Sequence, residues 1–151
     1  MNEAYDYARP SAFIRGMEIA VPAGSRLVFV SGTASVGPKG ETLHRGDFRA
    51  QARRAFENAG RVLAAAGAGW KDVVKTTVFL KDIRRHYRAF NEERLAFFQR
   101  EGIQPYPAST CIEARLCRED LLVEMEAIAI AGPASTLSVR RDRGTRKPRR
   151  R

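Results

Sequence analysis

The spacing of apolar side chains along the chain predicts two helices and several strands. From Asp47 to Ala66 apolar residues recur three or four positions apart, which is the period of an amphipathic helix, and Asp47 is a suitable N-cap. A second helix is predicted from Ile83 to Arg100, with Asp82 as its cap. Short runs of β-branched or alternating apolar residues predict strands over residues 13–19, 26–33, 73–80, 109–116 and 121–130.

These elements follow one another as a strand pair, a helix, a strand, a helix and a second strand pair. The first pair is joined by Val21-Pro-Ala-Gly-Ser25, which is a turn by composition, so we expect a hairpin. The β-branched segment 73–80 is expected to be a central strand. The order indicates an α+β domain with a mixed sheet that carries two helices on one face. The other face then needs a cover, and further copies of the chain are the simplest one.

The net charge of +10 is concentrated at the C-terminal end of the chain. Residues 140–151 hold eight basic side chains and one acidic side chain, so they account for +7 of this charge. We predict that residues 133–151 form a basic, disordered tail. Because the tail has no aromatic residues for base stacking, we expect weak, salt-dependent adhesion to nucleic acid and no specific binding.

Several protein classes are disfavoured by the composition. No apolar run approaches the about 18 residues of a membrane span, and the first residues lack the basic and apolar regions of an export signal, so we expect a cytoplasmic protein that makes no membrane contact. The two cysteines, Cys111 and Cys117, have no histidine or further cysteine at metal-ligand spacing. We therefore expect no metal, no cofactor and no disulfide framework.

Two carboxylates lie two residues apart in the last predicted strand. Successive side chains of a strand alternate between its faces, so Glu124 and Glu126 share one face with the aliphatic residues around them. Desolvation raises the pKa of such an acid, which makes one of the two a candidate general acid. The alternative is that one or both form salt bridges with some of the many arginines.

Several spaced blocks resemble the YjgF/RidA family, also called the Rid or L-PSP family. The blocks are Ser31-Gly-Thr-Ala-Ser35, Val73–Asp82, Pro107–Leu116 and Val123–Ala129, together with Gln51, Asn58 and Asn91. The likeness spans about residues 8–132, which we take as one RidA-like domain. It implies a chorismate-mutase-like α+β fold and a homotrimer whose sheets face inward, with three ligand clefts at the subunit interfaces.

The resemblance also implies a set of cleft residues and one departure from the family. Imine-hydrolysing members carry an arginine after the Pro-Ala pair to bind the substrate carboxylate, whereas this chain has Ser109. We expect Arg15 to be the best substitute for that missing charge. The cleft positions that match the family are Ser31, Gly32, Asn91, Cys111 and Glu124, the last as the acid that activates water or donates a proton.

A second resemblance is to the C-terminal half of chorismatases, which remove pyruvate from chorismate. It is carried by Tyr7–Phe13, Phe29–Ser35, His44–Asp47 and above all Cys117–Glu124. It implies that Glu124 protonates an enol ether and that Cys117 shapes the pocket, and Arg15 or Arg115 would pair with the substrate carboxylates. Chorismatases are about twice as long as this chain.

Three functions follow from the sequence. The first is an enzyme that acts on an enolpyruvyl or enamine-like carboxylate by general-acid chemistry through Glu124, with chorismatase-like release of pyruvate. The second is a 2-imino acid deaminase of the RidA type with a relocated carboxylate-binding group. The third is a non-catalytic trimeric protein that binds a ligand or associates with RNA, which the basic tail would suit.

Overall fold

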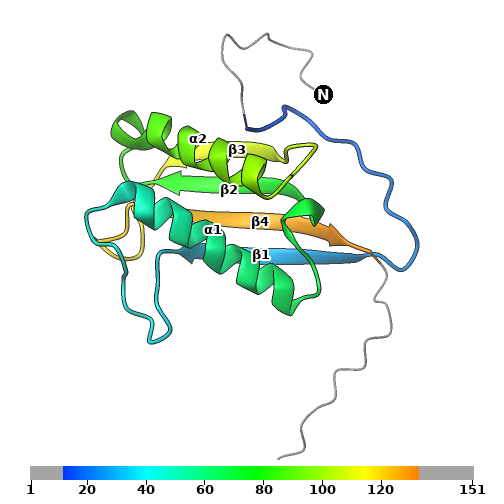
Figure 1. Cartoon of the computed structure of the whole chain (residues 1–151), viewed down its shortest axis with the longest axis horizontal. Coiled ribbons are helices and arrows are strands. Elements are labelled where there is room, and N and C mark those ends of the chain that lie inside the picture. Colours follow the sequence, from blue (N-terminus) through cyan, green and yellow to red (C-terminus); the bar gives the residue numbers. More distant parts are fainter. Residues whose placement is uncertain (1–11, 133–151) are drawn as a thin grey trace, which may run out of the picture.

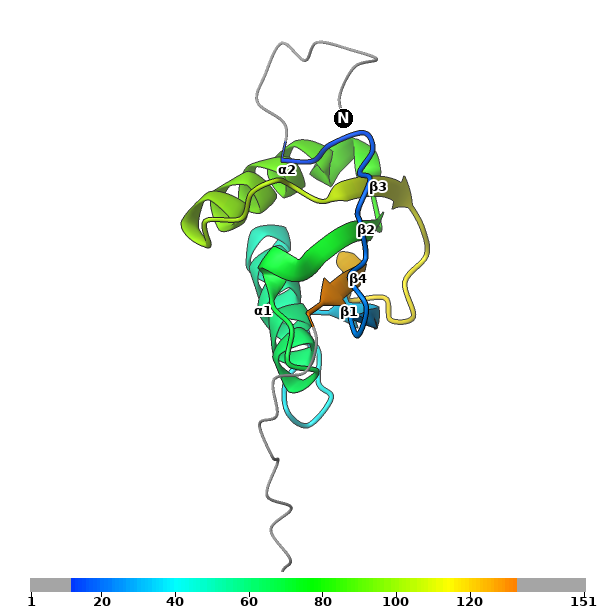
Figure 2. The ribbon, with the colours of Figure 1, turned by 90° about the vertical axis from the view of Figure 1, so that its right-hand side faces the viewer.

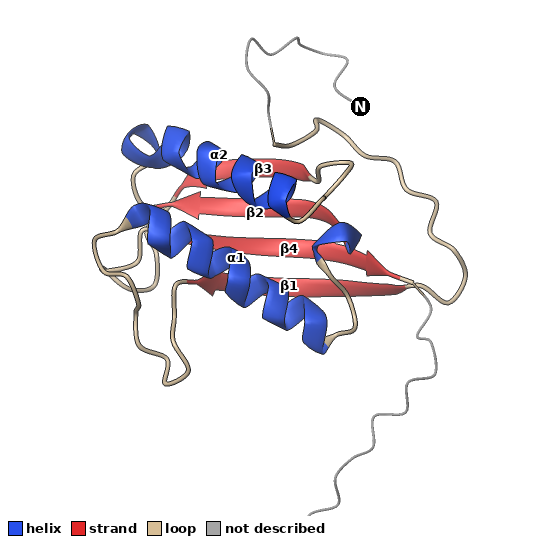
Figure 3. Cartoon of the chain, viewed as in Figure 1, coloured by secondary structure: helices blue, strands red, loops and turns tan. Residues whose placement is uncertain are grey.

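The computed structural model describes residues 12–132 as a sheet covered by two long helices (Figures 1 and 3). In chain order the elements are β1 (Arg26–Ala34), α1 (Phe48–Ala65), the 3-10 helix η1 (Trp70–Asp72), β2 (Val73–Leu80), α2 (Ile83–Arg100), β3 (Ala108–Glu113) and β4 (Val123–Ala131). Figure 2 shows both long helices on the same side of the sheet. The predicted α+β class, with two helices on one face, is confirmed.

The strands are ordered β1-β4-β2-β3, and the sheet is mixed as predicted. Strand β4 is antiparallel to both β1 and β2, whereas β2 is parallel to β3. The expected pairing of the last two strands with each other is therefore wrong, because β2 lies between them. A parallel pair needs a crossover connection, and α2 supplies it, which carries β3 to the outer edge of β2.

The expected hairpin at the start of the domain is also wrong. Residues 13–19 form no strand, and only Ile14 makes an isolated bridge, to Ala108 of β3. From there the chain crosses the ends of the strands to reach β1, whose partner is β4 (Figures 1 and 2). The turn itself does form, since the Ser25 amide donates to the Pro22 carbonyl at 3.1 Å. Its composition predicted a change of direction but could not select the pairing partner.

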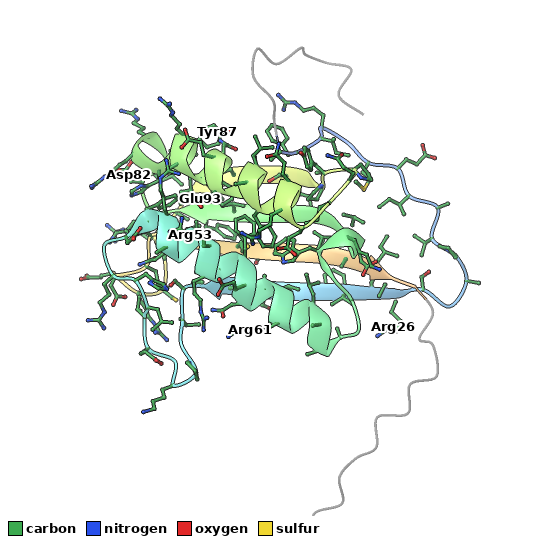
Figure 4. All side chains as sticks on the ribbon, viewed as in Figure 1. Arg26, Arg53, Arg61, Asp82, Tyr87 and Glu93 are labelled. Atoms are coloured by element: carbon green, nitrogen blue, oxygen red, sulfur yellow. The ribbon has the colours of Figure 1, made fainter. Side chains whose placement is uncertain are left out.

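The two helices begin where their caps were predicted. The Asp47 carboxylate accepts from the Ala50 amide at 3.0 Å, and the Asp82 carboxylate accepts from the Arg85 amide at 2.9 Å. Between the helices, Arg53 forms an ion pair with Glu93 at 2.9 Å, and the two side chains point toward each other in Figure 4. These contacts fix the ends and the spacing of the helices over the sheet.

The core lies between the helices and the sheet and is rich in aromatic rings. Phe56 is 1% exposed, and its ring stacks on that of Phe97 at a centroid distance of 4.7 Å. The buried aromatic residues of α2 belong to this core, whereas Tyr87 is 43% exposed. The ring cluster consists of Phe56, Trp70, Phe90, Phe97 and Phe98.

The sheet face without helices exposes apolar side chains. Leu27 and Phe29 of β1 are 59% and 70% exposed, and Ile112 of β3 is 43% exposed. Exposed apolar residues grouped on one face are typical of an interaction surface. None of the helices within residues 12–132 is both long and apolar enough to cross a bilayer. The predicted basic tail, residues 133–151, lies outside the described residues.

Candidate active site

Glu124 lies on the sheet face opposite the helices. Along β4 the buried positions alternate with more exposed ones, and Val123 and Met125 are buried while Glu124 is intermediate and Glu126 exposed. The strand period of two produces this pattern, since every second side chain faces the helices. Glu124 and Glu126 therefore do share one face.

Gly32 is held directly against the Glu124 carboxylate. The β1–β4 register shifts between Val30 and Thr33, which marks a bulge at Gly32. A Cβ atom added to Gly32 would lie 1.9 Å from Glu124 Oε1. Only glycine leaves room for the carboxylate at this position, so the sequence-predicted pair Gly32 and Glu124 forms one structural unit.

The Glu124 carboxylate lines a cavity of about 510 Å³. The cavity also holds Gly32 and Cys117, which the sequence assigned to the same pocket. Its volume is within the range of small-molecule sites, roughly 300–1,000 Å³. Its basic side chains come from α1 and from the loop before β4, and they are Arg54, Arg61 and Arg118.

The charges around the cavity favour an anionic ligand. Neither Glu124 nor Glu126 forms an ion pair within residues 12–132, so the salt-bridge alternative is not realised there. Arg61, which lies beside β1 in Figure 4, lines the same cavity as Glu124. Arg54 pairs with Glu57 at 3.2 Å. An unpaired carboxylate can exchange a proton with a ligand that the arginines attract.

A second group of predicted site residues surrounds Arg94 of α2. Arg94 Nη1 donates to the Ser109 hydroxyl at 2.9 Å, and Nη2 donates to Asn91 Oδ1 at 2.5 Å. Cys111, on the same side of β3 as Ser109, is half-buried, and burial raises the pKa of its thiol. The structure thus brings Asn91, Ser109 and Cys111 together on one arginine.

Arg94 was not predicted as a site residue. A signal for it was present, because it follows Asn91 by three positions and therefore shares its helix face. It also falls among the apolar positions of α2 that pack into the core, where an arginine is unusual. Its contact with Ser109, fifteen residues away, depends on how α2 packs on β3.

The other predicted residues do not line the cavity of Glu124. Ser31 is exposed and lines a smaller hollow of about 190 Å³ that contains Lys75 and Glu126. Arg115 is exposed in the loop after β3, which ends at Glu113. Arg15 is exposed in the segment before β1, and its expected role in binding a carboxylate stays a prediction. Among residues 12–132, no group of three or more His, Cys, Asp or Glu side chains is arranged so that it could bind a metal ion.

The two groups lie toward opposite edges of the sheet. Gly32 is on β1 and Ser109 is on β3, and these are the two edge strands. Three strand spacings of about 4.8 Å separate them, roughly 14 Å in all. One chain therefore does not assemble the predicted residues into a single cleft.

The comparisons with known proteins agree on one family. The model of the family described as Endoribonuclease L-PSP matches residues 12–131. A protein named 2-iminobutanoate/2-iminopropanoate deaminase, from Salmonella typhimurium, is 36% identical over 118 residues, which cover 78% of this chain and 86% of the relative.

Solved structures show the same fold. A protein of the conserved Rid family from Yersinia pestis superposes with a TM-score of 0.74 and 27% identity, covering 85% of this chain and 95% of the other. The structure of E. coli TdcF with bound serine has a TM-score of 0.64 and 30% identity, and the coverage is 85% of this chain and 100% of the other.

Proposed function

Because the chain belongs to the Endoribonuclease L-PSP family, also called the Rid family, we propose that it is a deaminase that hydrolyses short 2-imino acids. The observation that carries the proposal is the Glu124 carboxylate, which lies against Gly32 in an arginine-lined cavity and has no ion pair within residues 12–132. The name of the Salmonella relative, 2-iminobutanoate/2-iminopropanoate deaminase, supports the same reaction class.

The reaction consumes one water and needs one group that both accepts and donates a proton. Glu124 takes a proton from a water molecule as the water oxygen bonds to the carbon of the protonated imine, which gives a carbinolamine. Glu124 then returns this proton to the nitrogen. As the C–N bond breaks, Glu124 takes the hydroxyl proton and passes it to the departing ammonia, so the products are a 2-oxo acid and ammonium. A carboxylate that is not committed to an ion pair is suited to both steps.

A 2-imino acid also carries a carboxylate, which has to be held near Glu124. The basic side chains that line the cavity, Arg54, Arg61 and Arg118, would attract such an anion toward Glu124, although Arg54 is already paired with Glu57. The related TdcF was solved with serine bound, so a protein of this fold can hold an amino acid. This supports a substrate of similar size.

We further propose that the protein works as the homotrimer that the sequence led us to expect. The exposed residues Leu27, Phe29 and Ile112 on the helix-free face would be covered by neighbouring copies. The edge of one subunit, with Ser109 and Arg94, would then meet the edge of the next, with Gly32 and Glu124. Light scattering coupled to sizing should give three times the chain mass of 16.9 kDa, and a monomer that is fully active would contradict this.

The deaminase proposal is tested with an imine made in situ by an amino acid oxidase. Free imine is captured by semicarbazide as an absorbing semicarbazone, so an enzyme that hydrolyses the imine lowers the semicarbazone yield in proportion to its concentration. The Glu124→Gln variant should lose this effect on the semicarbazone yield. The Glu126→Gln variant is its matched control and should keep the effect, because Glu126 shares the strand and face of Glu124 but does not line the 510 Å³ cavity. Semicarbazone formation that is unaffected by the wild-type protein would contradict the proposal.

Enol-ether chemistry, which the sequence favoured first, is the second candidate. The name of the Salmonella deaminase supports the imine reaction and gives the chorismatase-like interpretation no support. One observation favours keeping it: Cys117 does line the cavity of Glu124, as that resemblance implied. Pyruvate release from chorismate, followed with a coupled dehydrogenase, is the test, and no release would eliminate it.

A further inference from the structure

Arg94 is a buried cation without a carboxylate partner. Its side chain is 2% exposed, and no Asp or Glu within residues 12–132 pairs with it. Its guanidinium carbon lies 5.1 Å from the ring centroid of Phe13 and 5.2 Å from that of Phe90. Buried arginines are normally paired with an acid, because leaving a buried charge uncompensated is costly. The Arg94 guanidinium is therefore suited to attract a negative charge.

Two further features of the guanidinium bear on whether it can attract an anion. Arg94 Nε is buried and has no hydrogen-bond partner in the part of the chain that the structure describes. Burial lowers the pKa of Arg94 from 12.5 to about 10, so the guanidinium still carries its charge at neutral pH.

The Ser109 hydroxyl is hydrogen-bonded to Arg94, and the positive charge of Arg94 strengthens this hydroxyl as a donor toward a ligand. Its oxygen accepts from Arg94 Nη1 and from Thr76 Oγ1, each at 2.9 Å. A hydroxyl has two acceptor positions and one donor, so both acceptor positions are used and the proton is free to be donated. Hydrogen bonds in a chain polarise one another, which makes Ser109 a stronger donor toward a carboxylate. Ser109 is only half-buried, so a ligand can reach it.

The position of this group agrees with the resemblance. Ser109 stands where imine-hydrolysing members of the family carry an arginine, and Arg94 places its guanidinium behind that same position. Asn91, a predicted cleft residue, accepts a hydrogen bond from Arg94 Nη2 through its side-chain oxygen. The side-chain amide nitrogen of Asn91 donates to the Tyr87 carbonyl at 2.9 Å. This chain therefore has a guanidinium group next to position 109, but the group belongs to a residue of α2 and not to β3.

We propose that Arg94 is the positioning residue that supplies the positive charge for the substrate carboxylate, acting through the Ser109 hydroxyl. The identity of the substrate as a 2-imino acid rests on the proposed function, but the carboxylate site does not. Its ligand class is a short 2-oxo or 2-imino carboxylate. The group contributes much less to the binding of a neutral ligand of the same shape.

The test compares 2-oxobutanoate with 2-oxobutanamide, which has the same size but no charge. Binding is measured by calorimetry on the full-length protein, so that no turnover is needed. We expect the wild type to bind the acid about 10- to 100-fold more tightly than the amide, which is the range of a charge-assisted hydrogen bond. Arg94→Gln should reduce this preference to less than about 3-fold, a change that a purely structural role would not cause.

Three further variants complete the test, and two of them, Arg94→Lys and Ser109→Ala, do not depend on the folding of Arg94→Gln. Arg94→Lys keeps the charge and should keep most of the preference, whereas Ser109→Ala removes the hydroxyl and should lose it. Ser109→Arg in the Arg94→Gln background should restore it, because the new guanidinium would contact the carboxylate directly. A preference that survives in either Arg94→Gln or Ser109→Ala overturns the proposal, and so does a wild type that does not distinguish acid from amide.

The outcomes also separate this inference from the proposed function. If the wild type hydrolyses no imine but shows a preference for the acid that depends on Arg94, the deaminase proposal fails and the carboxylate site stands. If imines are hydrolysed and Arg94→Gln still prefers the acid, the carboxylate site is wrong and the deaminase stands.

Discussion

Replacing Gly32 with alanine should strongly reduce the proposed imine hydrolysis without unfolding the protein. The added Cβ would lie 1.9 Å from Glu124 Oε1, and ordinary contacts of a Cβ begin at 3.4 Å, so the carboxylate has to move by about 1.5 Å. Glu124 is half-buried and its far end is flexible, so it can rotate away. A displacement of about 1 Å at a reacting group can lower a rate by about 100-fold, which equals about 2.7 kcal/mol of activation free energy.

The same substitution should change the free energy of unfolding very little. Turning Glu124 away from its preferred rotamer costs about 0.5–1.5 kcal/mol. Replacing glycine within a strand lowers the entropy lost on folding and returns about 0.5–1 kcal/mol. The two effects nearly offset each other, so we expect a melting temperature within about 3 °C of the wild type.

Imine hydrolysis and thermal melting are measured side by side on four proteins: the wild type, Gly32→Ala, Glu124→Gln and the double variant. Because both changes act on the same carboxylate, Gly32→Ala should add nothing to the loss caused by Glu124→Gln. Near-wild-type activity of Gly32→Ala would refute the argument, and so would a further loss of more than about 10-fold in the double variant.

Three other perturbations have defined outcomes. The fully buried Gln51 side chain donates to the His44 and Asp120 carbonyls and accepts from the Leu122 amide. Gln51→Leu should therefore lower the free energy of unfolding, measured in urea, by more than about 2 kcal/mol, and a decrease of less than about 0.5 kcal/mol would contradict this. Burial raises the pKa of the Cys111 thiol, so iodoacetamide at pH 8 should label the exposed Cys117 first, and mass spectrometry that finds Cys111 first would oppose the assignment. Burial and the Arg85 charge lower the pKa of His86, which stacks on Phe48. The folded protein then binds fewer protons than the unfolded chain, so stability should fall as the pH drops through about 6.5; His86→Gln should flatten that slope, and an unchanged slope would assign it to other groups.

The features that the sequence predicted well are set by local interactions. Both helices have an aspartate that caps the first turn and an apolar face with a period near 3.6, so their limits follow from neighbouring residues. The same holds for the alternation along β4 that places Glu124 and Glu126 on one face.

The features that failed depend on contacts between distant segments. The pairing of β1 with β4 joins residues about 100 positions apart, and nothing in the Val21–Ser25 turn indicates it. The position of β3 beyond β2 follows from the crossover through α2. Arg94 was missed for the same reason, because its importance arises only when α2 packs against Ser109 of β3.

The most direct test of the account is the rate of 2-imino acid hydrolysis by Glu124→Gln. Glutamine keeps the shape of the side chain against Gly32 but cannot carry a proton between water and nitrogen. We expect the wild type to accelerate hydrolysis and the variant to lose about 100-fold or more, with an unchanged melting temperature. A Glu124→Gln protein as active as the wild type would show that Glu124 does not transfer the proton, and the proposed mechanism would be wrong.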